Sequence, residues 1–546
     1  MSEADYVGDP ENHTLKGVEA PRASQARAPS SNHGLKAVVA HHACDFEPSG
    51  LSAAELFVRG LGITYSDFNI LDTNYTEITR DQVSLETDLG KNITLKIPII
   101  GPPMDRVTND RFCIALALEG GIGAIHFNHP PQNGRSSIDE QVGEIIRVKR
   151  YQSGFIHDPV AVAPDMTIKQ ALESGVRYYA GGSPIENFPV THDGSSNGKL
   201  VGFLRKHDYF SGSRLDCRVE ERMVPGDKVI VGRWPMTLNQ AQEMLWECRV
   251  SSLPVLDEQG CLKYLVTSSD IEKHEKYPRA TLDEHHRLRV LFAVSTRPPE
   301  AYERLERGFT AGADGVVIDT SQGFAFYESD MIRHVLEKYP DKLVIGGNIS
   351  TAEATRFLRR EKSDSYRCGQ GVGSICTTAG TIGIARAGAT SVYECARALV
   401  GTSLRTIADG GLREAGDLVK ALAVGAHACM LGNLLAGTEE GPGEVIVDPE
   451  TQSLMKEYRG MGSKEANVGG KRGYTRMPEG VSGKVPYHGS VHTWVPLLVD
   501  AIEHAFEVLN YRSISELHHA LYEGRLRFER RTIGSVREMG VHDLIR

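Results

Sequence analysis

DGVVIDTS (residues 314–321) and LVIGGNI (343–349) are short apolar runs that end in small or polar residues, with a helix-length segment between them. The pattern recurs in GGIGAIH (120–126), LFAVST (291–296), RTIADGG (405–411) and ACMLGN (428–433). Such alternation predicts a parallel sheet. The number of units favours an α/β fold of the (β/α)8 barrel type, with its active site where the strands pass into loops. A doubly wound sheet is the alternative, although GQGVGS (369–374) does not have the dinucleotide-binding G-x-G-x-x-G spacing.

The bulk composition excludes several classes of protein. With 546 residues, the chain is long enough for two or three domains. A net charge of −10 argues against nucleic-acid binding through phosphate contacts. Nine cysteines without a C-x-x-C pair argue against a disulfide framework or a zinc site. No apolar run is long enough to span a membrane, and the polar N-terminal region does not resemble a secretory signal. We therefore expect a cytoplasmic protein.

The barrel pattern is interrupted between about residues 152 and 275 by an internal repeat. The first copy begins at DPVAVAPDMTIKQALE (158–173) and the second at DKVIVGRWPMTLNQAQEML (227–245). Two copies of one unit can bury a face that neither buries alone. The pair resembles a tandem CBS (Bateman) module, which implies a purine-nucleotide ligand on Asp208 and Asp270. The alternative is that both carboxylates only cap helices.

We predict three segments from these boundaries. Residues 1–50 are rich in Ser, Pro, His, Asn and Ala and form a disordered arm. Residues 51–151 and 276–546 form the barrel, and 152–275 form the inserted repeat.

CGQGVGSICTTAG (368–380) places one thiol, Cys376, in a glycine-rich loop followed by hydroxyl residues. Glycines allow a tight backbone path there, and an activated thiolate is a nucleophile. On this stretch alone, a small buried thiol in a tight loop is the simpler interpretation. Three further loops, ADGG (408–411), MLGN (430–433) and YRGMG (458–462), favour a functional site instead. Glycine turns after the late strands of a barrel commonly bind phosphate.

The order of eight motifs resembles the IMP dehydrogenase / GMP reductase family from Leu51 to His542. The motifs are PPMD (102–105), DTSQG (319–323), GGNI (346–349), GVGSICTT (371–378), ADGG (408–411), MLGN (430–433), YRGMGS (458–463) and PEGVSGKVPYHGSV (478–491).

The resemblance implies that Cys376 attacks C2 of a bound purine 5′-nucleotide, with Thr378 and Glu479 as the proton-transfer pair. It also implies an NAD(P) cofactor and a homotetramer, or an octamer formed through the CBS pairs. The other implied roles are phosphate binding by Ser374, Gly411, Gly432 and Tyr458, ribose binding by Asp409, base binding by Met461 and Gly462, and cofactor binding by Asp319 and Asn348. Potassium would be bound by carbonyl groups of Gly371, Gly373 and Cys376, and by Glu538, Met539 and Gly540 of a neighbouring subunit.

Two reactions fit this resemblance. A dehydrogenase converts IMP and NAD to XMP, and it carries an adjacent Arg-Tyr pair on a long flap to activate water. Here Glu479 comes only 18 positions after Met461, and the segment contains Arg472-Gly473-Tyr474 instead of an adjacent pair. This short flap favours a GMP reductase that uses NADPH, and IMP dehydrogenase is the alternative.

A second alternative is a nucleotide sensor with an inactive barrel. Three departures from the family pattern, Pro102, Asn433 and GIARAGATS (383–391), put some nucleotide affinity in doubt. The retained Cys376, Thr378, Asp409 and Glu479 argue for an enzyme.

Overall fold

The structure is a computed structural model that describes residues 49–131, 134–151, 154–177, 185–209, 215–467 and 477–540. The arm predicted over residues 1–50 therefore lies almost entirely outside the described residues. From residue 49 onward the chain forms one compact unit by its internal contacts.

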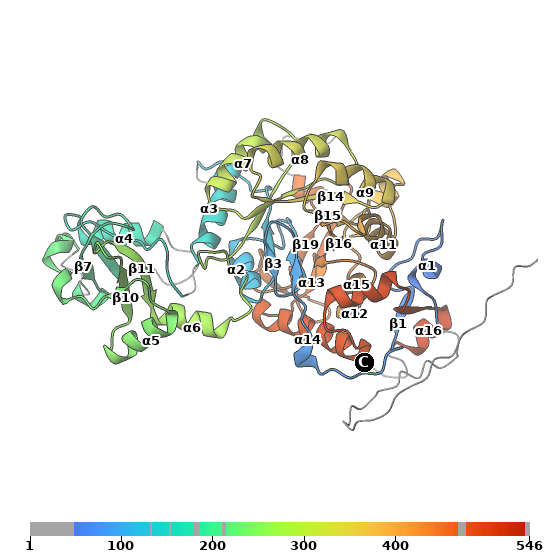
Figure 1. Ribbon diagram of the computed structural model, residues 1–546. Coiled ribbons are helices and arrows are strands. Elements are labelled where there is room, and N and C mark those ends of the chain that lie inside the picture. Colours follow the sequence, from blue (N-terminus) through green and yellow to red (C-terminus); the bar gives the residue numbers. More distant parts are fainter. Residues whose placement is uncertain are drawn as a thin grey trace, which may run out of the picture. The chain divides into compact units, whose positions relative to one another are not determined.

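Eight parallel strands in the described part of the chain close into a barrel, so the predicted fold is confirmed and the doubly wound alternative is wrong (Figure 1). Each neighbouring pair is parallel, as consecutive βα units require. The strands in barrel order are β12 (Leu291–Val294), β13 (Gly315–Ile318), β14 (Leu343–Ile349), β15 (Ser365–Cys368), β16 (Arg405–Asp409), β17 (Ala428–Met430), β4 (Ile99–Gly101) and β5 (Ile122–Ile125).

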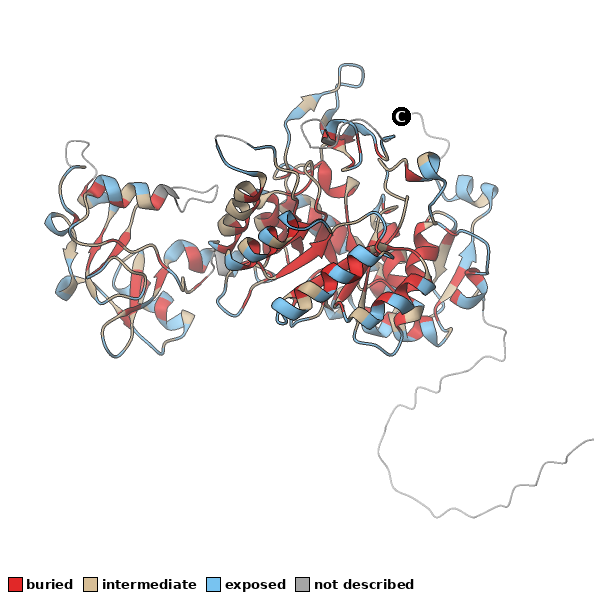
Figure 2. Cartoon of the chain, turned by 90° about the horizontal axis from the view of Figure 1, so that it is seen from above, coloured by how far each residue is buried: buried red, intermediate tan, exposed pale blue. Residues whose placement is uncertain are grey.

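Helices follow the strands along the chain and cover the barrel wall (Figure 1). They bury their apolar faces together with the outward-facing side chains of the strands. The strands themselves are almost entirely buried (Figure 2). The main helices of this layer are α2 (Asp110–Leu118), α3 (Ser137–Lys149), α7 (Glu300–Thr310), α8 (Phe326–Lys338), α9 (Ala352–Leu358), α11 (Gly388–Leu399), α12 (Ala415–Ala423) and α14 (Val491–Leu509).

A hairpin closes the N-terminal end of the barrel. Its strands, β2 (Thr87–Asp88) and β3 (Thr94–Leu95), carry Leu89 and Leu95 into the interior core formed by the strands. The hydroxyl of Ser365, at the start of β15, donates to the carbonyl of Leu89. With this end filled, the C-terminal end is the one that is left for a site.

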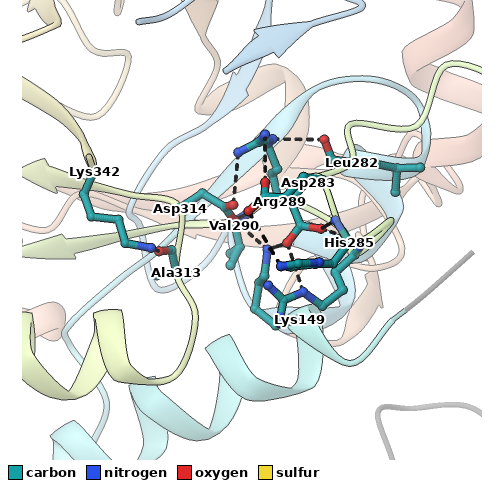
Figure 3. A network of polar contacts seen from close by, with 11 residues as sticks. Lys149, Leu282, Asp283, His285, Arg289, Val290, Ala313, Asp314 and Lys342 are labelled. Carbon is teal, nitrogen blue, oxygen red and sulfur yellow. Dashed lines mark hydrogen bonds and ion pairs between the residues drawn. The ribbon is translucent and has the colours of Figure 1, made fainter. Parts of the chain in front are cut away.

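A buried polar network joins α3 to the starts of β12 and β13 (Figure 3). Lys149, the last residue of α3, lies 2.9 Å from both Asp283 and Asp314. Arg289 pairs with Asp314 at 3.2 Å, and Asp314 also accepts from the backbone N–H of Val290. Burial would raise the pKa of Asp283, but Lys149 and the surrounding donors outweigh it and lower the pKa to about 2.

The internal repeat forms two related units between β5 and β12. Each unit has a helix followed by a two-stranded antiparallel pair. The two copies are hydrogen-bonded to each other through Leu200, Leu262 and their neighbours. The first contains α4 (Ile168–Arg177), β6 (Phe188–Thr191), β7 (Leu200–Leu204) and β8 (Val224–Pro225), and the second β9 (Gly232–Arg233), α5 (Leu238–Glu247), β10 (Ser252–Leu256), β11 (Leu262–Thr267) and α6 (Ser268–Lys276).

The remaining elements flank the barrel. A short helix, α1 (Ala53–Leu56), follows Leu51 and begins with a capping box at Ser52 and Glu55. No helix among the described residues is long and apolar enough to cross a membrane. The other elements are β1 (Phe68–Leu71) paired with β21 (Arg527–Arg530), α10 (Thr378–Ile382), α13 (Asn433–Ala436), the sheet of β18 (Val445–Val447), β19 (Leu454–Arg459) and β20 (Ser482–Pro486), α15 (Ile514–Tyr522) and α16 (Ile533–Glu538).

Candidate active site

Cys376 lies in the loop between β15 and α10, at the C-terminal end of the barrel strands. Two glycines make this path possible. A Cβ at Gly369 would lie 1.9 Å from the carbonyl oxygen of Asp409, and Gly371 has a φ of 76°. The backbone N–H of Cys376 donates to the carbonyl of Gly373 at 3.0 Å, which folds the loop back on itself. The thiol is partly exposed, unlike Cys368 at the end of β15, which is buried.

A hydrogen-bonded relay joins the thiol to a carboxylate. The Cys376 Sγ donates to Thr378 Oγ1 at 3.1 Å, and Thr378 Oγ1 donates to Glu479 Oε2 at 2.9 Å. Thr378 is only 6% exposed, so its hydroxyl is held within the wall of the site. The relay offers a path for a proton between the thiol and the acid. It brings together the three residues that the sequence assigned to catalysis.

Backbone pairing holds Glu479 beside the cysteine loop. Residues 376 and 480 form an antiparallel bridge, and the N–H of Val481 donates to the carbonyl of Ile375 at 2.9 Å. The N–H of Glu479 donates to the carbonyl of Gly462, so the expected base-binding pair Met461 and Gly462 borders the relay. The stretch that contains Arg472 and Tyr474 lies outside the described residues.

The predicted phosphate cup, made of Ser374, Gly411, Gly432 and Tyr458, is partly assembled around Tyr458. A Cβ at Gly432 would lie 2.3 Å from the Tyr458 hydroxyl, so only glycine fits there without a shift. Burial raises the pKa of Tyr458, and a hydrogen bond with Ser374 partly opposes that effect. Asn433 donates to the Ser374 hydroxyl at 3.4 Å. Gly411 has a φ of 80° and lies against Val372 of the cysteine loop.

Asp409, Asn348 and Asp319 meet around one arginine that the sequence analysis missed. Arg367, 3% exposed on β15, lies 2.9 Å from Asp319 and 3.6 Å from Asp409. Asn348 Nδ2 donates to Asp409 at 2.8 Å and to the carbonyl of Gly369 at 2.9 Å. Burial raises the pKa of Asp409, while Arg367 and Asn348 act in the opposite direction. The sequence could have pointed to Arg367, because it is a charged residue within the strand SYRC (365–368) and the neighbouring strands of the barrel are mostly apolar.

This cluster fits the polar end of a dinucleotide cofactor. Arg367 Nε is buried and makes no hydrogen bond to the described residues, so the cluster retains a donor. The Asp319 carboxylate and the Asn348 amide oxygen supply acceptors for ribose hydroxyls and a carboxamide N–H, while both N–H groups of Asn348 donate to Asp409 and Gly369.

The residues expected to hold potassium fall into two groups. Gly371, Gly373 and Cys376 lie on the single folded loop described above, where carbonyl oxygens suit a hard monovalent cation. Glu538 ends α16, and Met539 and Gly540 follow it. The second group is expected to act from a neighbouring subunit, so the potassium site would need residues of two chains. Potassium binding stays a prediction.

In the repeat, both expected nucleotide carboxylates make local bonds. Asp208 accepts from the backbone and the guanidinium of Arg205, and Asp270 accepts from the Thr267 hydroxyl at 2.5 Å. Such bonds are those of turn and helix caps. Nucleotide binding by this pair remains a prediction.

The closed parallel barrel brings a relay-linked thiol and glycine-lined loops to the C-terminal ends of its strands, which is the arrangement of a (β/α)8 enzyme. Residues 62–542 match the model of the IMP dehydrogenase / GMP reductase domain. The chain belongs to this family of NAD(P)-dependent purine nucleotide oxidoreductases.

The similar proteins include relatives named IMP dehydrogenase and a solved structure of a GMP reductase. The inosine-5′-monophosphate dehydrogenase of Aquifex aeolicus is 37% identical, covering 88% of this chain and 96% of the relative. That of Schizosaccharomyces pombe is 36% identical, covering 90% and 93%. Among solved structures, a cysteine-to-alanine variant of Trypanosoma brucei GMP reductase in complex with guanosine 5′-monophosphate has a TM-score of 0.78 and 33% identity, covering 89% and 98%.

Proposed function

We propose that the protein is a GMP reductase, converting GMP and NADPH to IMP, ammonia and NADP. The relay from Cys376 through Thr378 to Glu479 carries this proposal, because it supplies both a nucleophile and a proton store. The chain's own flap sequence supports the reductase direction, since no adjacent Arg-Tyr pair precedes Glu479. The structural likeness to a GMP reductase gives further support.

The relay both activates the thiol and protonates the leaving group. Cys376 passes its proton through Thr378 to Glu479, and the thiolate forms a bond to C2 of GMP. Glu479 then gives this proton, through Thr378, to the amino group of GMP, the C2–N bond breaks, and ammonia leaves. NADPH, when bound, supplies a hydride to C2. The C2–S bond then breaks, which releases IMP and leaves the thiolate, and a proton taken up from solvent regenerates the thiol.

The remaining residues bind and orient the nucleotide in this proposal. Ser374, Gly432 and Tyr458 offer hydroxyl groups and close backbone approach to the phosphate. Asp409 accepts from the ribose hydroxyls, and Arg367 holds it in place.

IMP dehydrogenase is the second candidate, because the curated relatives named above carry that name at 36–37% identity over most of the chain. In that reaction the same thiol would bond to C2 of IMP, hydride would leave to NAD, and water would release XMP. That reaction needs a base that activates the water. No adjacent Arg-Tyr pair lies between Met461 and Glu479 to supply this base.

Parallel assays decide between the candidates. Purified protein is mixed with GMP and NADPH, or with IMP and NAD, while the absorbance of the reduced cofactor is followed. Consumption with GMP supports the reductase and production with IMP supports the dehydrogenase. If the absorbance changes in neither assay, the result supports a nucleotide sensor and contradicts the proposal that the protein is an enzyme. Cys376→Ala abolishes either activity if the covalent route holds, and unchanged turnover contradicts it.

A further inference from the structure

A buried glutamate, Glu328, lies beneath the cofactor side of the site. It is the third residue of α8, in the layer of helices around the barrel, and it is 0% exposed. Its Oε1 accepts from the backbone N–H of Gly347 at 2.8 Å. Its Oε2 lies 3.4 Å from Thr320 Oγ1, which also donates to the carbonyl of Gly347 at 3.0 Å. Glu328 thus joins the ends of β13 and β14, from which Asp319 and Asn348 project.

The charges around Glu328 are unbalanced. From β15, Arg367 faces it as the cation and Tyr366 as a neutral phenol, and from the end of β13, Asp319 faces it as an anion. Arg367 already pairs with Asp319 and lies near Asp409. From β14, the backbone N–H of Gly347 donates to Glu328, and a Cβ at Gly346 would lie 3.0 Å from its Oε1. An ionised Glu328 would be a third carboxylate for one buried guanidinium, which is costly without further partners.

We propose that Glu328 is a positioning residue for the cofactor subsite and that it acts as a neutral carboxylic acid. In that form Oε1 accepts from Gly347 and Oε2–H donates to Thr320, so both oxygens are satisfied. The residue fixes the peptide that carries Asn348, and Asn348 in turn donates to Asp409 and Gly369. This inference builds on the proposed oxidoreductase function.

The electrostatics agree with the geometry. Burial raises the pKa of Glu328 to about 8, although the Gly347 N–H and Arg367 oppose the shift. Above that pH the ionised carboxylate draws the Thr320 hydroxyl proton away from the Gly347 carbonyl and competes with Asp319 for Arg367. We therefore expect cofactor affinity to fall on the alkaline side.

Glu328→Gln tests the proposal, because the amide reproduces the acceptor and donor of the neutral acid. We expect its kcat/KM for the cofactor to stay within about threefold of wild type at pH 7, and to remain level through about pH 9. The wild-type value falls about tenfold from pH 7 to pH 9, as a single ionisation requires. Glu328→Ala raises the cofactor KM about tenfold at every pH and raises the nucleotide KM by less, because Asn348 and Arg367 also contact Asp409. Glu337→Gln, on the exposed face of the same helix, is the control and behaves as wild type.

An alkaline limb that is the same in Glu328→Gln and wild type would overturn the proposal, as would equal effects of Glu328→Ala on both substrates. If the protein catalyses neither the reductase nor the dehydrogenase reaction, thermal unfolding still tests whether Glu328 is neutral in the folded protein. A native group whose pKa is raised destabilises the fold increasingly as pH rises from about 4.5 to about 8. The melting temperature of Glu328→Gln should therefore exceed that of wild type by a margin that grows over this range. A constant difference would show that Glu328 is ionised in the fold and would refute the neutral acid, whatever the activity.

Discussion

At the scale of single residues, some positions of the site cannot hold a larger side chain unless a neighbouring residue moves. Gly432 is the sharpest case, because a Cβ there would meet the Tyr458 hydroxyl at 2.3 Å. The MLGN motif marks Gly432 in the sequence, but it does not reveal the close contact that separates this position from Gly416, where a Cβ would meet no heavy atom within 4 Å. The difference comes from the approach of β19 to the loop after β17, which only the fold brings about.

We predict that Gly432→Ala raises the nucleotide KM at least about tenfold, because Tyr458 must leave its place in the phosphate cup. Gly416→Ala is the matched control and keeps the wild-type KM. Adding Tyr458→Phe to Gly432→Ala relieves the contact, so the double variant should lose less than the sum of the two single losses. Steady-state kinetics with the preferred nucleotide measures wild type, the three single variants (including Tyr458→Phe) and the double variant. Additive losses would contradict the contact.

At the scale of elements, the polar network at the starts of β12 and β13 fixes α3 to the barrel. Lys149 is 4% exposed and neutralises Asp283 and Asp314 together (Figure 3). Removing it leaves two buried carboxylates with less charge compensation.

We predict that Lys149→Met lowers the free energy of unfolding by about 3–5 kcal/mol, measured by urea denaturation at pH 7. The pKa of Asp283 is depressed, so its stabilising contribution is present above about pH 4 and disappears as the pH falls through about 2. The penalty of Lys149→Met should therefore shrink in acid. Lys338→Met, at the exposed end of α8, costs little at either pH. A penalty independent of pH would contradict the ionic account.

The sequence predicted elements better than side-chain contacts. Strand–helix alternation was sufficient for the barrel, because each run such as LVIGGNI (343–349) carries its own local signal. The relay between Thr378 and Glu479 joins residues 101 positions apart, and only the family resemblance placed them together. Arg367 and Glu328 were missed, since a charge inside an apolar pattern does not reveal its partners. Asp208 and Asp270 make local bonds to Arg205 and Thr267, and nucleotide binding by these carboxylates stays a prediction.

At the scale of the whole molecule, the repeat between β5 and β12 is a separate pair of small sheets with its own cores. We propose that it is the CBS module expected from the sequence and that it binds purine nucleotides. The proposed homotetramer or octamer belongs to this scale too, because residues 538–540 are expected to act on a neighbouring chain.

We predict that ATP or GTP changes the reaction rate or the oligomer size of the full-length protein without competing with the substrate. Sedimentation velocity and initial rates, with and without nucleotide, measure this effect. Asp208→Ala combined with Asp270→Ala should abolish it and keep the basal rate, since neither residue belongs to the barrel. An unchanged response in that variant would show that these carboxylates are caps only.

The most direct test of the account concerns the sulfur of Cys376. Wild-type protein is incubated with GMP, or with IMP and NAD, quenched in acid, and analysed by mass spectrometry of the intact chain and its peptides. We predict a mass increase of one purine nucleotide on the peptide that contains Cys376, and none in Cys376→Ala. Turnover without any nucleotide on that peptide, under conditions that retain the adduct, would contradict the account.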